Sequence, residues 1–376
     1  RNSQRKEILF VERCLELVKI GGEIGIVLPI GILNNTNDQY ARKFILRRAK
    51  ITGIVSLPVH TFVPFGSGMK TALVFLEKYK ENEAPRWGTY KVFMSVAHNI
   101  GYDSTGREIP QNDLHEGILD CFKNKKSNSS MNVEFFEPNE FVQTLKVKEI
   151  QTSFDLNRLD PDYHFLTTQC DAILSKLSLP LKNLKTLVKD PIKSGTRPHG
   201  RAQYIEGEIP SLEGGNVSDT GHIIIQNLKV IPRSFHKSHI ASAVCVGDIL
   251  VVKDGATTGK VGMLPKDFPH EECNINEHLF RVRINAGIID PYYVFGFLFS
   301  GIGQLLLKRE ITGGAQGGIA KSAMQNLLIP IPPKEVQQKI GNDIQNTLQK
   351  VFELQNDIQI TIDGFKKSVI NTFNQS

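Results

Sequence analysis

The chain has 376 residues, of which 40% are hydrophobic and 22% charged, and its formal net charge is +6. This composition is typical of a globular protein and argues against a disordered, collagenous or membrane-spanning chain. No apolar run approaches the ~18 residues of a spanning helix, and the first residues lack the basic, apolar, small-residue order of a signal peptide, so we expect a cytoplasmic protein. Five scattered cysteines without a CxxC pair predict reduced, mostly buried thiols.

The positive charge is concentrated in two parts of the chain. The net charge is +7 for residues 1–80, −5 for 81–180, +4 for 181–335 and zero for 336–376. Two basic segments around an acidic one suit a polyanionic partner, because neutralising phosphates releases counterions. Many basic surfaces have no such partner, so charge alone does not identify one.

The first 80 residues predict part of a doubly wound α/β domain. Residues 7–20 place apolar side chains at helical spacing and end at Gly21-Gly22, a typical C-cap, while residues 42–49 predict the end of a second helix. Three short apolar runs predict strands buried on both faces, as in a parallel sheet covered by helices: 23–29, 51–57 and 71–76.

Two runs in this part carry a family resemblance, "FVERCLELVKIGGEIGIVLPIGIL" and "ITGIVSLPVHTFVPFGSGMKTALVFLEKY". Their order resembles the C-terminal half of adenine-specific DNA amino-methyltransferases of restriction-modification systems, of the modification-subunit type. The resemblance implies that residues 62–70 form a loop over the target-base pocket, with Phe62 packing on the flipped adenine and Phe65 as a close rival. A Phe that only anchors the loop is an equal alternative, and Lys70 could meet a phosphate or simply be solvated.

The motifs that would carry methyl transfer are missing from this sequence. In the family, S-adenosylmethionine binds at a glycine-rich loop, and the target amino group is held by an Asn-Pro-Pro-aromatic motif; neither occurs here. In the family's order both lie upstream of Arg1. We therefore expect no catalytic, cofactor-binding or metal-binding residue in this chain, no methyl transfer by it alone, and S-adenosylmethionine as the cofactor of the complete enzyme.

Residues 81–179 are predicted to be an acidic connector, since strong periodicity is lost there. Its last part, "FDLNRLDPDYHF" at 154–165, resembles the segment that precedes a recognition domain in fused systems. Residues 180–335 then predict a β-rich domain with short strands between glycine-bearing turns, including a hairpin at 246–260 and a core helix at 291–308.

Three runs in this domain, among others, carry a second resemblance: "GEIPSLEGGNVS", "GDILVVKDGATTGKVG" and "INEHLFRVR". They resemble the target recognition domains of type I specificity subunits, although Asn276-Glu277 stands where an Asn-Gln pair is usual. Glycine-rich turns at 255–260 and 313–318 would let the backbone approach DNA, lysines and arginines would meet phosphates, and polar side chains would read bases. A turn-forming or capping role is the alternative for each residue. The DNA-binding candidates are Lys70, Lys193, Ser194, Thr196, Arg197, Gln203, Asn216, Lys253, Thr257, Thr258, Lys260, Gln316 and Lys321.

Three further motifs resemble a P-loop, a zinc site and a nuclease site, but their residues do not support these functions. The run "DGATTGK" has three residues between its glycines where a P-loop has four, and Val261 replaces the Ser or Thr that binds magnesium. His270, Cys273 and His278 lack a second pair of zinc ligands. Asp248 and Lys253 border an apolar strand, which favours a strand-edge ion pair over a nuclease site.

Residues 336–376 predict one long assembly helix. Apolar residues recur every three or four positions from Ile340 to Val369, a seam typical of coiled coils, although a helix docked on its own domain would share it. Specificity subunits have two such helices, which pair. With one helix here, either two chains form a homodimer, or the helix docks onto a methyltransferase subunit or the upstream part of the enzyme; a restriction subunit is a further expected partner.

The leading hypothesis is sequence-specific recognition of double-stranded DNA by the C-terminal part of a restriction-modification enzyme. A second hypothesis is a scaffold that recruits a methyltransferase or nuclease without reading bases. A third is a complete enzyme with an unrecognised site.

Overall fold

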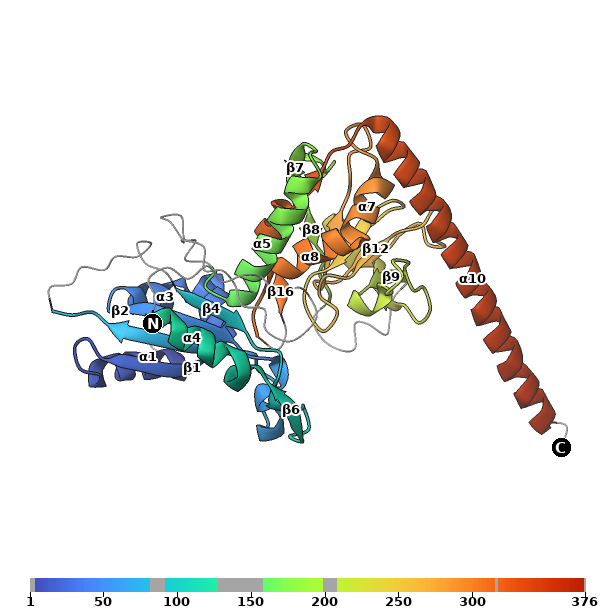
Figure 1. Ribbon diagram of the computed structural model, residues 1–376. Coiled ribbons are helices and arrows are strands. Elements are labelled where there is room, and N and C mark those ends of the chain that lie inside the picture. Colours follow the sequence, from blue (N-terminus) through green and yellow to red (C-terminus); the bar gives the residue numbers. More distant parts are fainter. Residues whose placement is uncertain (1–3, 82–91, 128–157, 199–207, 315–316, 375–376) are drawn as a thin grey trace. The chain divides into compact units, whose positions relative to one another are not determined.

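The computed structural model describes residues 4–81, 92–127, 158–198, 208–314 and 317–374. The chain forms two compact units, which are described separately (Figure 1). Unit 1 contains residues 1–169 and 312–317, and unit 2 contains residues 170–311 and 318–376. Unit 1 is therefore discontinuous in the sequence.

A four-stranded sheet forms the centre of unit 1, in the order β1-β3-β2-β4. Its elements are α1 (Lys6–Leu17), β1 (Glu23–Pro29), α2 (Ile30–Asn34), α3 (Gln39–Leu46), β2 (Ala49–Ser56), β3 (Thr71–Lys78) and β4 (Phe93–Val96). The helix and the three strands that periodicity predicted are present. The predicted parallel direction is wrong for β3, which is antiparallel to both β1 and β2. The connection before β3 holds only the 3-10 helix η2 (Val59–Phe65), without the α-helical crossover that usually joins parallel neighbours.

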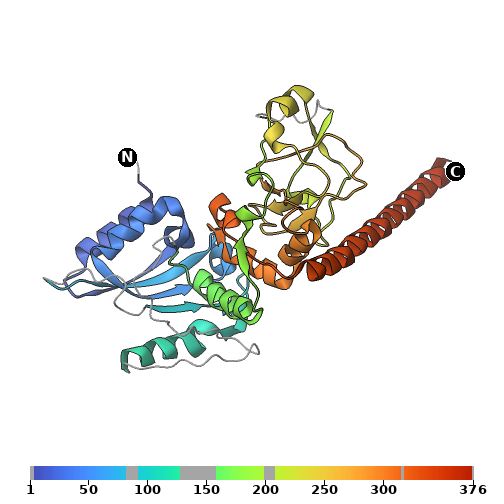
Figure 2. The same cartoon turned by 90° about the horizontal axis from the view of Figure 1, so that it is seen from above.

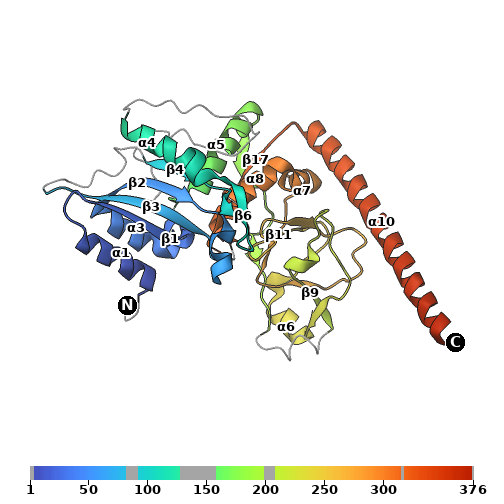
Figure 3. The same ribbon diagram turned by 60° about the horizontal axis from the view of Figure 1, so that its bottom comes forward.

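Helices cover the two faces of this sheet unequally. Figure 3 shows α1 and α3 on one side and α4 (Leu119–Ser127) on the other. On the α4 side, Phe122 packs on Phe75 and Phe93 beneath β2, β3 and β4. On β1, by contrast, burial alternates, and Val27 is 44% exposed. The prediction that β1 is buried on both faces is therefore wrong, because it lies at the edge of the described sheet.

The remaining elements of unit 1 follow β4. A hairpin forms from β5 (Ile100–Tyr102) and β6 (Glu108–Asn112), and a single π-helical turn, η3 (Leu114–Ile118), leads into α4. Residues 93–127, which the sequence analysis assigned to the connector, thus include a strand of the central sheet. The helix α5 (Pro161–Lys176) begins in unit 1 and ends in unit 2.

Unit 2 is rich in short strands, as the sequence predicts. One sheet has the order β12-β11-β14-β8 and a second the order β10-β9-β13. The strands are β8 (Lys193–Ser194), β9 (Ile209–Leu212), β10 (Lys229–Ile231), β11 (Ile249–Val252), β12 (Val261–Met263), β13 (Asn274–Ile275) and β14 (Leu279–Val282). Two further pairs are β7 (Leu181–Asn183) with β17 (Leu328–Pro330), and β15 (Ile311–Thr312) with β16 (Gly318–Ile319). The hairpin predicted at 246–260 is formed by the antiparallel pair of β11 and β12, and its second strand begins just beyond the predicted range.

The strand β11 is the centre of the core of unit 2. Ile249 and Val251 belong to one buried cluster, and Leu250 and Val252 belong to another on the opposite face. The first cluster is covered by α7 (Pro291–Phe299) and α8 (Gly301–Arg309). These are two helices where one was predicted, because Ser300 interrupts the run and its hydroxyl caps α8 by accepting a hydrogen bond from Gly303 N.

The C-terminal helix α10 (Lys334–Asn374) has 41 residues, a length of about 60 Å. Its first turns pack on α7, where Ile344 and Leu348 join the core. From Leu354 to Ile370 the apolar side chains are exposed, and Figures 1 and 2 show this half extending away from the rest of unit 2. In the part of the chain that the structure describes, no helix combines the length and apolarity needed to cross a membrane.

Candidate nucleic-acid interface

In unit 1 the loop between β2 and β3 presents aromatic side chains. Phe62 is half-buried, whereas Phe65 is 75% exposed, and their ring centroids are 6.5 Å apart. Tyr102 meets Phe65 edge-on and donates a hydrogen bond of 2.7 Å from its hydroxyl to the Thr61 carbonyl. Gly66 ends η2 at a φ of 86°. The loop is therefore anchored near Thr61 and leaves the ring of Phe65, more than that of Phe62, accessible to a ligand.

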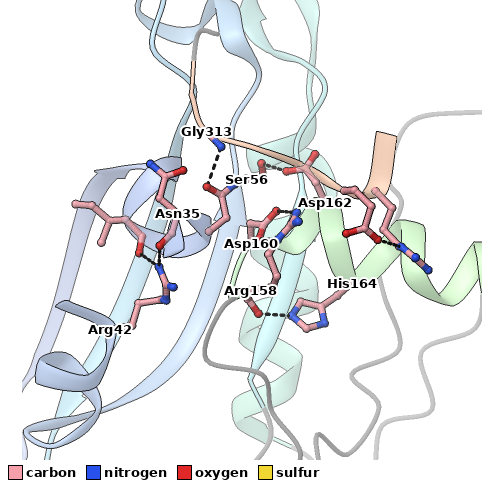
Figure 4. A network of polar contacts seen from close by, with 12 residues as sticks. Asn35, Arg42, Ser56, Arg158, Asp160, Asp162, His164 and Gly313 are labelled. Atoms are coloured by element: carbon pink, nitrogen blue, oxygen red, sulfur yellow. Dashed lines mark hydrogen bonds and ion pairs between the residues drawn. The ribbon is translucent and has the colours of Figure 1, made fainter. Parts of the chain in front are cut away.

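Lys70 ends this loop in an ion pair. Its Nζ lies 2.9 Å from Asp162 Oδ1. The Ser56 hydroxyl donates to the other oxygen of this carboxylate at 2.6 Å (Figure 4). Burial raises the pKa of Asp162, but the attraction of Lys70 and these hydrogen bonds outweigh it, so this pKa lies below its ordinary value. Lys70 is thus a partner of Asp162 at the end of the sheet, which argues against both a solvated lysine and a free phosphate contact.

The segment 154–165 folds back on unit 1 in its described part. Arg158 donates two hydrogen bonds to Asp160, at 2.8 and 2.9 Å, and both side chains are buried. Leu159 lies in the core and donates from its backbone to the Leu33 carbonyl. Nε2 of His164 is hydrogen-bonded to the Arg158 carbonyl oxygen, and burial lowers the pKa of the His164 ring (Figure 4).

The glycine-rich segment 312–317 also belongs to unit 1. Gly313, at a φ of 101°, donates its N–H to Oδ1 of the buried Asn34 at 3.1 Å (Figure 4). A Cβ on Gly314 would lie 3.4 Å from Met69 Cγ. The described part of this turn therefore lies beside the aromatic loop.

In unit 2 two sequence-predicted residues join a polar group that we call the charged cluster: Arg197, Lys253, Asp254, Glu277 and His278. Arg197 Nε lies 2.6 Å from Glu277 Oε1. Lys253 Nζ lies 3.3 Å from Asp254 Oδ2 and donates to the Glu277 carbonyl at 3.0 Å. His278 is paired through Nδ1 with Asp254, and its Nε2 is 3.5 Å from Glu277 Oε1. The cluster thus combines donors and acceptors in one network.

The backbone holds Arg197 next to this network. Thr196 N donates to the Ile275 carbonyl at 3.2 Å, and Gly195 N donates to the Leu279 carbonyl at 3.3 Å. A Cβ on Gly195 would lie 1.9 Å from the Ile275 oxygen, so only glycine allows this approach. The side chain of Arg197 therefore starts from a fixed point of the chain.

The other predicted DNA contacts lie in different environments. Asn216 is buried, accepts from Glu213 N at 2.9 Å and donates to the Ile224 carbonyl at 3.1 Å, which favours the turn-forming alternative over base reading. Thr258 donates to the Gly255 carbonyl within its turn, and Lys260 pairs with the exposed Asp219 at 2.7 Å. The remaining residues are distributed as follows: Lys193 and Thr257 are half-buried, Ser194 and Lys321 are exposed, and Gln203 and Gln316 lie outside the described residues.

Sequence reasoning did not single out Asp254 and Glu277 as parts of the site, and it considered His278 only as a metal ligand. Their proximity depends on the pairing of β11 with β14, in which Val252 faces Leu279. Residues just after β11 thereby meet residues just before β14. Of the other two zinc candidates, Cys273 lies in the core, where burial raises the pKa of its thiol to about 12.

Two protein families match this chain. Residues 1–167 match the family described as N-6 DNA Methylase, and residues 191–363 match the Type I restriction modification DNA specificity domain. These matches confirm both resemblances found in the sequence. No curated protein matches the chain.

Several solved structures are similar to this chain at low identity. The S subunit of a type I restriction-modification system from M. genitalium is 15% identical over 50% of this chain and 44% of that one, with a TM-score of 0.37. The HsdS subunit from Thermoanaerobacter tengcongensis is 14% identical over 55% and 57%, at 0.33. The type IIG restriction endonuclease BpuSI is 13% identical over 90% and 44%, at 0.38. The chain spans roughly half the length of these proteins.

Proposed function

We propose that this chain, which joins an N-6 DNA methylase domain to a type I restriction-modification DNA specificity domain, binds double-stranded DNA at a specific sequence within a restriction-modification enzyme. The observation that carries the proposal is the match of residues 191–363 to a DNA specificity domain. A scaffold that reads no bases is not favoured by this match.

Unit 2 supplies the reading surface in this proposal. Phosphate contacts would fix the register of the domain on DNA, and polar side chains would read base edges. Lys321, exposed at the start of α9 (Lys321–Gln325), supports a phosphate contact. Arg197 is the candidate for base readout, because its side chain is 52% exposed and its backbone is fixed.

Unit 1 supplies the surface for the target base. An extruded base needs an accessible aromatic face on which to stack. The exposure of Phe65 favours it over Phe62, the first choice from the sequence. The ion pair of Lys70 with Asp162 would hold the end of this loop against the sheet while the base enters.

S-adenosylmethionine would supply the methyl group in the complete enzyme. The residues of this chain do not fit its site, because the sequence has neither the glycine-rich loop nor an Asn-Pro-Pro-aromatic motif. Those parts would come from a methyltransferase partner or an upstream segment. The outer edge of β1 and the exposed Leu9, Phe10 and Leu17 of α1 support docking of such a part on unit 1.

Two copies of α10 would pair along the exposed residues Leu354, Ile358, Ile362 and Phe365. A homodimer would then carry two reading surfaces and recognise a bipartite, symmetric site. Replacing Ile358 and Phe365 by Glu tests this by sedimentation. We expect monomers at concentrations where the unmodified chain is dimeric, and a monomeric unmodified chain would contradict the pairing and favour docking of α10 on a methyltransferase subunit.

Selection from a random duplex library at several salt concentrations tests the main proposal. We expect one enriched sequence and an affinity that falls as salt rises, because lysines and arginines displace counterions from phosphates. Recovery of no enriched sequence would contradict the proposal and restore the scaffold hypothesis.

A further inference from the structure

We propose that the charged cluster reads a G·C base pair in the major groove, and that Glu277 is the residue that makes it discriminate. The inference rests on the proposed function, sequence-specific DNA binding by unit 2. It goes further by assigning the cluster to base edges and not to phosphates, and by naming the base pair.

The charges of the cluster argue against a phosphate site. Arg197 and Lys253 are matched by Glu277 and Asp254 at 2.6 and 3.3 Å. Counterion release requires cations that are not already neutralised by the protein. A phosphate that approached Arg197 would also meet the Glu277 carboxylate, and like charges repel. The cluster therefore disfavours random contact with the DNA backbone.

The accessible groups fit the edge of one base pair. Guanine presents two acceptors in the major groove, and arginine is their most common partner; cytosine presents an amino donor, which Glu accepts. The ion pair of Arg197 is made through Nε, and the guanidinium also carries two terminal nitrogens, which would donate to guanine in this proposal. Arg197 and Glu277 are 52% and 31% exposed. Oε2 of Glu277 is buried and has no hydrogen-bond partner among the described residues, so Oε1, which also pairs with Arg197, would be the oxygen that accepts from cytosine. Because Arg197 and Glu277 are adjacent, a single G·C base pair can form hydrogen bonds with both side chains.

The cluster is also preorganised, which lowers the entropic cost of binding. Asn276, itself buried, accepts from His278 N at 3.0 Å and so fixes the start of β14. Lys253 donates to the Glu277 carbonyl, and Gly195 brings the backbone before Arg197 against Ile275. The same contacts could serve only to stabilise the packing of β8 on β14. The experiment must distinguish this structural role from base readout.

The test compares Glu277→Gln with the unmodified full chain on two duplexes, the selected sequence and a scrambled sequence of equal composition. We expect binding to the selected duplex to fall about tenfold, because the carboxylate acceptor for cytosine is lost. Binding to the scrambled duplex should rise, because the repulsion of phosphate is removed. The matched control is Glu271→Gln, an exposed residue in the loop before β13, which should change both affinities by one small, equal factor.

If Glu277→Gln changes the affinity for both duplexes by the same factor, the inference is overturned. A selected sequence in which no G·C pair is required would also overturn it. If Glu277→Gln does not fold, as judged by circular dichroism, Arg197→Gln replaces it. This variant should lose the preference for guanine at one position without gaining affinity for the scrambled duplex, and retained preference would overturn the inference. If the unmodified chain selects no sequence, the proposed function itself fails.

Discussion

The two candidate DNA-facing surfaces of this protein have opposite chemistry. The loop of unit 1 exposes an apolar ring, Phe65, held by a tyrosine and an ion pair at its ends. The charged cluster of unit 2 exposes matched donors and acceptors. An aromatic face binds any base, because every base has a π surface, whereas a fixed pattern of donors and acceptors suits few. The comparison suggests that one surface holds a base and the other chooses the site.

Gly195→Ala should have the largest effect, and it acts on the charged cluster. The new Cβ would meet the Ile275 carbonyl oxygen at 1.9 Å, and backbone cannot yield as a flexible side chain can. We expect the free energy of unfolding to fall by about 3 kcal/mol. Urea denaturation measures it. Gly215→Ala is the control, because its Cβ meets nothing within 4 Å, and equal losses in the two variants would contradict a close approach of Gly195 to Ile275.

Phe65→Ala should distinguish binding of the extruded target base from selection of the DNA sequence. In the chain assembled with its methyltransferase part, loss of stacking should weaken capture of the extruded base by about 1–3 kcal/mol. The fluorescence of 2-aminopurine at the target position reports extrusion, while the sequence selected by the library should stay the same. Phe62→Ala serves as the comparison. A larger loss of fluorescence in that variant would restore Phe62 as the stacking residue.

Asn216→Ala tests whether Asn216, which the sequence suggested as a base-reading residue, stabilises its own turn instead. The variant loses the hydrogen bonds to Glu213 N and the Ile224 carbonyl, so we expect unfolding to become easier by about 1.5 kcal/mol. Thermal melts measure the loss, and Asn216→Asp should recover part of it by keeping the acceptor. Unchanged stability with an altered sequence preference would return Asn216 to the reading surface.

Asp162→Asn should give the smallest effect and concerns the anchor of the aromatic loop. Because the folded-state pKa of Asp162 is depressed, its contribution to stability is present above the ordinary carboxyl pKa of ~3.9 and is lost as pH falls through the folded-state value. We expect a contribution below about 1 kcal/mol at neutral pH. Urea unfolding at pH 6 and pH 3 should therefore show a weaker acid dependence in the variant. An unchanged dependence would mean that Lys70 does not stabilise this carboxylate.

Local patterns predicted the helices and strands better than their partners. The periodicity of α1 and the apolar runs of β1, β2 and β3 were sufficient to place these elements. The direction of β3 was not predictable from such runs, since buried strands look alike in both orientations. The charged cluster was missed for a related reason: His278 and Asp254 are 24 positions apart, and only the register of β11 on β14 brings them together.

Polar residue types were ambiguous in the same way. Asn216 and Arg197 both looked suited to reading bases, yet one satisfies the backbone of its own turn and the other is exposed. Burial separates the two roles, and burial depends on tertiary packing. The sequence named Phe62 and Phe65 as rival stacking residues, but it did not show that Phe65 is the more exposed or that Tyr102 of a later hairpin meets its ring.

The return of residues 312–317 to unit 1 restricts how this protein can be divided or recombined. Residues 1–169 expressed alone would lack Gly313 and leave the amide oxygen of Asn34 without this donor. Grafting a foreign specificity module therefore requires three splice points, one near 170 and one on each side of 312–317. A chimera made at the first junction only would inherit a mismatched glycine turn beside the loop that carries Phe62 and Phe65.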